Sequence, residues 1–285
     1  MFARFEFDVA AEPVAAALAY GIGGAADGET VLVFDVGGGT FDVSLLQAFE
    51  GILEVLGTSG DSRLGGDDFD AALAGWITAQ LGPGCGRAWA AGAAEAAKIA
   101  LSSAPATTII AQDGRALELT EATFEEVTAH LFQRMAAPLA QLGREHFVEW
   151  AAAPEDAAPG DARAASASAS TTPSGAPGTP PGSGAAAPGA PERQRREDKW
   201  APPPRRVTRV ALVGQVTRLP SVRRFVERLT GVEPCCSVDP GEAVALGAAI
   251  QAGVLEGSVG QVELMDGSFV ADLHERVAGF GQWQA

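Results

Sequence analysis

The octet D-V-G-G-G-T-F-D, residues 35–42, lies between two apolar runs and contains three consecutive glycines. The preceding run, VLVFDV (31–36), predicts a buried strand, and the alternating FDVSLLQ (41–47) predicts a second one. Because glycine has no Cβ, the backbone of such a turn can bend sharply and approach a ligand closely. Several backbone N–H groups can then converge on phosphate oxygens. We therefore expect a phosphate-binding turn between two strands.

Oxygen-bearing side chains surround these glycines. Asp35 and Asp42 suit an Mg²⁺ ion held largely through water, since Mg²⁺ takes few carboxylates directly. Thr40 supplies a hydroxyl for the terminal phosphate of a nucleotide. The octet is not a Walker A loop, because no Gly-Lys-Ser/Thr follows and the glycines join two strands. A plain glycine hairpin with solvated acids is the alternative interpretation.

A second candidate for ligand contact is the predicted helix containing EAAKIALSSA (95–104). Glu95, Lys98 and Ser102 fall at positions i, i+3 and i+7, which share one helical face. A carboxylate and an ammonium on that face can grip ribose hydroxyls, while the serine can reach a base. The alternative is a solvent-facing Glu–Lys pair.

The charge and the cysteines limit the classes of partner and compartment. The formal net charge is −16, from 20 basic and 36 acidic residues, which argues against a nucleic-acid or anionic-membrane partner. No apolar run approaches the ~20 residues of a membrane span. The three cysteines have no C-x-x-C spacing, and the start MFARFEFDVA lacks the apolar core of a signal peptide. We expect a reducing compartment rather than secretion.

The composition changes sharply between residues 151 and 206, where Ala, Pro, Gly and Ser dominate and large apolar residues are almost absent. We predict a disordered insertion there, because such a segment cannot offset its ordering entropy by burial. It separates a first domain segment, 1–150, from a closing segment, 207–260, and a tail follows at 261–285. Outside the insertion, the patterns predict one further strand at 51–60, another at 207–214, and helices at 12–21, 67–81, 90–101, 121–142, 220–231 and 239–253.

Asp35–Asp42 resembles the second phosphate loop of the seventy-kilodalton heat-shock chaperones, a branch of the actin-like ATPases. Other stretches agree in order and spacing, and together they cover the chain outside the insertion and tail. They are the Glu-Pro helix beginning at Glu12, GTSGDSRLGGDDFD (57–70), EAAKIALSSA (95–104), VALVGQVTRLP (210–220) and VDPGEAVALGAAIQAGVLEG (238–257).

The resemblance implies an α/β, actin-like (ribonuclease H-like) ATPase fold, mostly the second lobe of a nucleotide-binding domain. It implies ATP or ADP with Mg²⁺ as ligands, and a J-domain protein and a nucleotide exchange factor as partners. The similarity to bacterial and plastid members implies the cytoplasm or the plastid stroma. Glu12 would act near Mg²⁺ and the attacking water, together with Asp35 and Thr40. The implied nucleotide contacts are Gly37, Gly38, Gly39, Thr40, Gly65, Gly66, Asp67, Glu95, Lys98, Ser102, Gly214 and Arg218.

The sequence also departs from the family pattern. The family's first phosphate loop (Asp-Leu-Gly-Thr-Thr) and the catalytic lysine of its first lobe are not found in these residues. Gln215 stands where the family has a second glycine, and Gly241 stands where it usually has Asp. VELMD (262–266) resembles the interdomain linker, but only a short tail follows. We therefore expect weak or no hydrolysis by this chain, and a non-catalytic interaction protein with an ATPase-like shell is the alternative.

Overall fold

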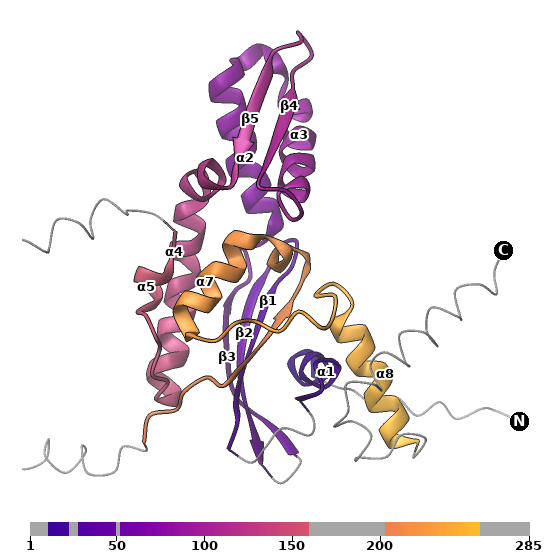
Figure 1. Cartoon of the computed structure of the whole chain (residues 1–285), viewed down its shortest axis with the longest axis vertical. Helices are drawn as coiled ribbons and strands as arrows, with labels where there is room; N and C mark the ends of the chain where they lie inside the picture. The colour runs from indigo at the N-terminus through magenta and orange to yellow at the C-terminus, as the bar shows by residue number, and fades with distance from the viewer. Residues whose placement is uncertain (1–10, 23–27, 50–51, 160–202, 257–285) are drawn as a thin grey trace, which may run out of the picture.

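The computed structural model of the chain describes residues 11–22, 28–49, 52–159 and 203–256. There, a four-stranded sheet carries helices on both faces, and a smaller helix–hairpin unit stands beyond one end of it (Figure 1). This arrangement has the mixed α/β character that the sequence predicts. The predicted tail and residues 160–202 of the predicted insertion lie outside the described residues.

The four-stranded sheet has the order β3-β2-β1-β6. Its strands are β1 (Thr30–Val36), β2 (Phe41–Phe49), β3 (Ile52–Asp61) and β6 (Arg209–Val213). The first three form an antiparallel meander, whereas β6 returns from far along the chain to pair parallel with β1. Asp35 lies opposite Asp42 on one side and opposite Val213 on the other. The glycine octet is therefore the connection between the two central strands.

Helices cover both faces of this sheet (Figure 1). The helices of the described residues are α1 (Glu12–Ala19), α2 (Gly66–Leu81), α3 (Arg87–Ala100), α4 (Glu121–His146), α5 (Pro154–Ala157), α7 (Pro220–Thr230) and α8 (Ala243–Leu255), with 3₁₀ turns η2 (Pro83–Cys85) and η3 (Gln215–Arg218). α4, α5 and α7 lie on one face of the sheet, and α1 and α8 lie on the other.

β1 contributes to a separate hydrophobic core on each face. Leu32, Phe34 and Val36 belong to the larger core with α2, α4 and α7. Val31 and Val33 belong to the smaller core with α1 and α8. A strand buried on both faces needs an apolar residue at nearly every position, which explains the unbroken run around Phe34.

Buried phenylalanines connect the sheet to the helices of the larger core. Phe34 lies 5.0 Å from Phe41 and 6.1 Å from Phe225 of α7, measured between ring centroids. The contacts continue from Phe225 to Phe132 of α4 at 5.5 Å and from Phe132 to Phe69 of α2 at 5.7 Å. Aromatic contacts of this kind add to the stabilisation from burial alone. They fix α2, which follows the candidate site, relative to the sheet.

α2 and α3 form the smaller unit together with a hairpin of β4 (Ala106–Ile110) and β5 (Ala116–Thr120), seen at the top of Figure 1. This hairpin was not predicted from the sequence. Its strands, ATTII and ALELT, are short and bury few side chains, so their alternation of apolar and polar residues is weak. The hairpin depends on packing against the neighbouring helices.

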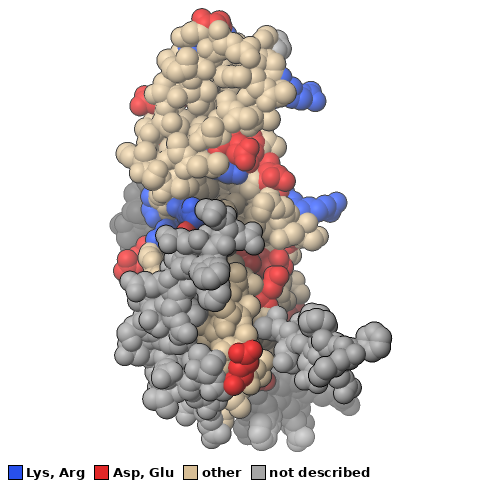
Figure 2. Space-filling view, turned by 90° about the vertical axis from the view of Figure 1, so that its right-hand side faces the viewer, with Lys and Arg blue, Asp and Glu red and all other residues tan. Residues whose placement is uncertain are grey.

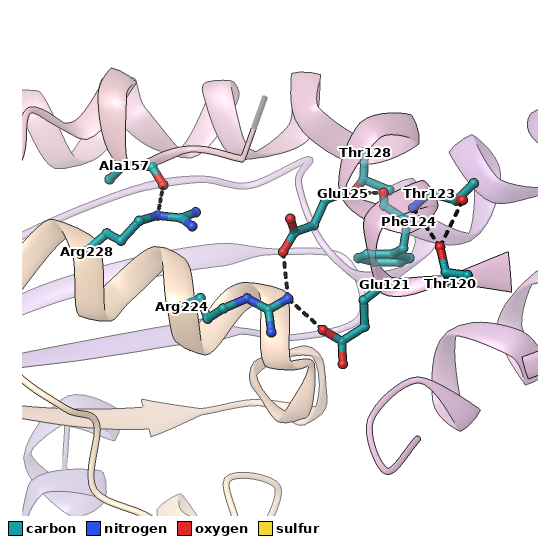
Figure 3. A network of polar contacts seen from close by, with 9 residues as sticks. All are labelled: Thr120, Glu121, Thr123, Phe124, Glu125, Thr128, Ala157, Arg224 and Arg228. Atoms are coloured by element: carbon teal, nitrogen blue, oxygen red, sulfur yellow. Dashed lines mark hydrogen bonds and ion pairs between the residues drawn. The ribbon is translucent and has the colours of Figure 1, made fainter. Parts of the chain in front are cut away.

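Ion pairs join α7 to α4 (Figure 3). Arg224 donates hydrogen bonds to Glu121 Oε2 at 2.8 Å and to Glu125 Oε1 at 2.7 Å. Arg228 donates to the carbonyl of Ala157 in α5 at 2.9 Å. Residues 151–159, which the composition assigned to the insertion, therefore pack against α4 and α7, and the ordered chain extends further than predicted. Their small size allowed close packing that a count of large apolar residues does not detect.

Candidate functional site

The glycine turn leaves part of its backbone unpaired. The amide of Gly37 donates to the carbonyl of Thr40 at 3.0 Å and closes the turn. Within the described part of the chain, the amides of Gly38, Gly39 and Thr40 have no hydrogen-bond partner, and these three residues are exposed. Of the three glycine amides in the turn, those of Gly38 and Gly39 are therefore unpaired, as is that of Thr40, whereas that of Gly37 is used inside the turn.

The fold alone does not explain glycine at positions 38 and 39. Neither residue has a positive φ, and a Cβ built on either would have no heavy atom within 4 Å beyond its immediate chain neighbours. The chain could therefore accept a side chain at both positions. Two glycines at these positions leave room for a ligand to approach the backbone closely.

Gly65, by contrast, is required by packing against the turn. A Cβ on Gly65 would lie 2.5 Å from both the carbonyl oxygen of Gly38 and the amide nitrogen of Gly39. At the start of α2, the amide of Gly66 donates to the Gly37 carbonyl at 2.9 Å, and that of Asp67 donates to the Gly38 carbonyl at 2.8 Å. The structure thus brings the second predicted glycine pair and Asp67 directly under the glycine turn and holds it there.

Three carboxylates face a common cavity beside the turn. Asp35, Asp42 and Glu12 line a cavity of about 450 Å³ between α1 and the sheet. Two hydroxyls that the sequence analysis missed, Ser44 and Thr58, also line it and are hydrogen-bonded to each other at 2.9 Å. Their alternation with inward-facing apolar residues on β2 and β3 was the available signal. Figure 2, which views the molecule from the side of α1 and α8, shows acidic side chains running down the middle of this face.

Burial, reinforced by the nearby charges of Asp42 and Glu12, raises the pKa of Asp35 to about 6. Among the described residues, no group of three His, Cys, Asp or Glu side chains comes close enough together to hold a metal ion. A cation bound directly by a carboxylate cage is therefore not supported there. Two acids close together still suit Mg²⁺, which keeps several of its waters and takes phosphate oxygens as further ligands.

Lys98 is engaged away from the solvent. Its Nζ donates to Asp70 Oδ2 at 2.6 Å and to the Gly66 carbonyl at 3.1 Å, and its side chain is only 13% exposed. The two residues predicted to share a face with Lys98 are more accessible to solvent: Glu95 is exposed and Ser102 is half-buried. Asp70 was missed by the sequence analysis. Its place four residues after Gly66, on the same face of α2, was the available signal.

Gly214 lies in the turn between β6 and η3, called the closing turn below, and brings this turn onto β1. Its φ is +81°, and a Cβ there would lie 2.2 Å from the carbonyl oxygen of Val36 and 2.8 Å from Asp35 Oδ1. Only glycine combines this conformation with so close an approach. Next to it, Arg218 is ion-paired with Asp239, so its guanidinium is already engaged.

Gln215 and Gly241, the two residues that depart from the family pattern, lie against each other. A Cβ on Gly241 would be 2.1 Å from Nε2 of Gln215. The side chain of Gln215 therefore occupies the space that a side chain at position 241 would need. The amide of Gly241 instead donates to Asp239 Oδ1 at 2.8 Å.

The family model described as Hsp70 protein matches residues 7–148 and 203–273. The chain belongs to the Hsp70 family. Its fold is accordingly the actin-like ATPase fold, as the sequence resemblance predicted. The Hsp70 match covers β1, β2 and β6, the strands that meet at Asp35.

Similar Hsp70 proteins come from plants and bacteria. "Heat shock 70 kDa protein 6, chloroplastic" of Arabidopsis thaliana is 36% identical over 273 residues, which are 90% of this chain and 30% of that protein. A "Chaperone protein DnaK" of Thermus thermophilus is 38% identical over 275 residues, 90% of this chain and 36% of that protein. The chain thus spans about a third of the length of these relatives. In the described ranges, no helix is both long enough and apolar enough to cross a membrane.

Proposed function

We propose that this chain binds a magnesium-chelated adenine nucleotide, ATP or ADP, as part of a chaperone-type ATPase domain. One observation carries the proposal: the unpaired amides of the glycine turn stand at the same end of β1 and β2 as the carboxylates of Asp35 and Asp42. Backbone amides in a turn hold phosphate oxygens, and a nearby Mg²⁺ neutralises phosphate charge. One short connection would therefore supply both the amides that hold the phosphate oxygens and the carboxylates that hold the Mg²⁺ ion.

Each residue then has a defined role. The amides of Gly38 and Gly39 and the hydroxyl of Thr40 would hold phosphate oxygens, and Gly65, Gly66 and Gly214 support that surface from behind. Asp35 and Asp42 would hold Mg²⁺ through its waters. Glu12 lines the same cavity, where a carboxylate can accept a proton from water.

We expect slow hydrolysis by the residues of this chain alone. The described residues that line the cavity include carboxylates and hydroxyls but no Lys or Arg. Fast phosphoryl transfer usually needs a positively charged side chain beside the transferred group, in addition to the metal ion. The rate of phosphate release, measured by a colorimetric assay, should therefore be far lower than the rate of nucleotide binding.

Replacing Gly38 and Gly39 together by alanine tests the proposal. The double variant should keep the melting temperature of the wild type, because the new Cβ atoms meet no atom of the chain. Its affinity for Mg-ADP, measured by titration calorimetry, should fall at least about tenfold through steric exclusion of phosphate. Gly65→Ala is the matched control for the fold, since its Cβ would collide with the turn and should lower the melting temperature. Wild-type affinity in the double variant would contradict the proposal.

A second candidate function is a non-catalytic interaction protein with an ATPase-like shell. The pairing of Lys98 with Asp70 and of Arg218 with Asp239 supports it, because both cations are already neutralised. Gln215 also fills space beside the closing turn. No heat at millimolar Mg-ATP and Mg-ADP, in a sample that remains folded, would favour this candidate over the first.

We extend the proposal to partners and compartment. A chaperone ATPase domain of this family would interact with a J-domain protein and a nucleotide exchange factor, and pull-down with each, in the presence of nucleotide, tests this. The chloroplastic relatives support the plastid stroma, and the bacterial relatives support the cytoplasm equally. Cell fractionation followed by immunoblotting separates the two locations.

A further inference from the structure

Arg134, on α4, reaches the turn that follows β3. Its Nη2 donates to Asp61 Oδ2 at 2.7 Å and to the carbonyl of Arg63 at 2.9 Å. Its Nη1 lies 3.5 Å from Asp68 Oδ1 in the first turn of α2. One guanidinium thus contacts the turn at its start, at its middle and beyond its end. The planar fork of arginine suits such multiple contacts, which the single ammonium of lysine cannot reproduce.

The acidic partners of Arg134 also make the hydrogen bonds that shape this turn. Asp61 Oδ1 accepts from the amide of Arg63 at 2.9 Å, and Asp68 Oδ2 accepts from the amide of Gly65 at 2.9 Å. The hydrogen bond from the Arg63 amide, followed by that from Arg134, lowers the pKa of Asp61. Both carboxylates are therefore held in the orientation that fixes residues 61–65.

The turn at residues 61–65, with the start of α2, supports the glycine turn (residues 37–40) of the candidate site. The amides of Gly66 and Asp67 donate to the carbonyls of Gly37 and Gly38. Among the described residues, these are the hydrogen bonds that hold residues 37–40 from outside their own hairpin. A shift of Gly65 would move the glycine turn with it, since the two backbones are in direct contact.

We propose that Arg134 is a positioning residue for the phosphate-binding turn. It does not line the cavity, and it acts through Asp61, Asp68 and the start of α2. The inference deepens the proposed function and rests on it for its consequence in ligand binding. Its structural part, the placement of residues 37–40, can be measured without any ligand.

Amide hydrogen exchange of the whole chain, followed by nuclear magnetic resonance, tests the structural part. In Arg134→Gln, the amides of Gly66 and Asp67 should exchange about tenfold faster relative to those of β1, as expected for the loss of a charged hydrogen bond. Arg224→Gln is the matched control, because Arg224 also contacts two carboxylates and its side chain is 41% exposed against 38% for Arg134. In the control, these two amides should keep their wild-type protection.

Titration calorimetry with Mg-ADP tests the consequence for the ligand. Arg134→Gln should weaken binding about tenfold, Arg134→Lys should recover part of the loss, and Arg224→Gln should bind as the wild type does. Unchanged exchange in Arg134→Gln, or an equal effect of both arginine variants, overturns the inference. A wild type that does not bind Mg-ADP, with the exchange effect present, overturns the proposed function and leaves the positioning of the turn supported.

Discussion

Replacing Gly247 by alanine is expected to lower the free energy of unfolding by about 3 kcal/mol or more. α1 and α8 cross at this residue, and a Cβ there would lie 1.6 Å from the carbonyl oxygen of Ala15 and 2.3 Å from its carbonyl carbon. Backbone atoms cannot move aside as the end of a side chain can. The two helices would have to separate and so open the smaller core, which includes Ala16, Leu246 and Ile250. Urea denaturation measures the loss as a lower midpoint at constant slope.

Gly75→Ala provides the control for this first prediction. Gly75 lies in α2, and a Cβ built on it would have no heavy atom within 4 Å. Alanine there should raise the stability by up to about 1 kcal/mol, through its higher helix propensity. Equal behaviour of the two alanine variants would show that the crossing of α1 and α8 does not limit the stability of the fold.

Asp35→Asn is expected to raise the free energy of unfolding by about 2 kcal/mol above pH 6 and to abolish binding of Mg-nucleotide. The folded protein raises the pKa of Asp35 from 3.8 to about 6, mainly through burial. An acid with a raised pKa binds its proton more tightly in the folded state than in the unfolded state. Stability of the wild type therefore falls as the pH rises from 3.8 to about 6, and the penalty persists above that range.

The pH dependence makes this second prediction specific. Near pH 4 the wild type carries a protonated Asp35, so the two proteins should be almost equally stable. Above pH 6 the wild type should gain stability when Mg-ADP is added, and the variant should not. Asp113→Asn is a suitable control, because Asp113 is exposed and pairs with Arg115 at the surface. A variant whose stability parallels the wild type at every pH would show that the burial of Asp35 has no energetic cost.

The strands around the glycine octet could be predicted because their patterns are local. The unbroken run at 31–36 reflects burial on both faces of the sheet, and the alternation after Phe41 reflects the pleat of β2. The start of α8 was less accurate. Asp239 looks like a helix N-cap, and its carboxylate accepts from the Gly241 amide and pairs with Arg218, but the helix begins only at Ala243.

The parts of the site that sequence reasoning missed depend on contacts between distant residues. The face shared by Glu95 and Lys98 is visible in the sequence, but the partner of Lys98 is Asp70, on another helix. Arg134 gave no local signal, because its partners precede it by 66 residues or more and belong to a turn and another helix. Spacing along one element predicts which side chains share a face. It does not predict which element a long side chain will reach.

The parallel pairing of β6 with β1 also has a consequence for synthesis of the chain. Thr30 and Thr208, which are hydrogen-bonded where these strands begin to meet, are separated by 178 residues. At the usual translation rates, this distance corresponds to on the order of 10 to 40 seconds between their exits from the ribosome. During that interval β1 can pair with β2 but has an open edge, which is a template for association with other nascent chains. A domain of a chaperone family therefore passes through a stage of its own biogenesis in which its central strand needs protection.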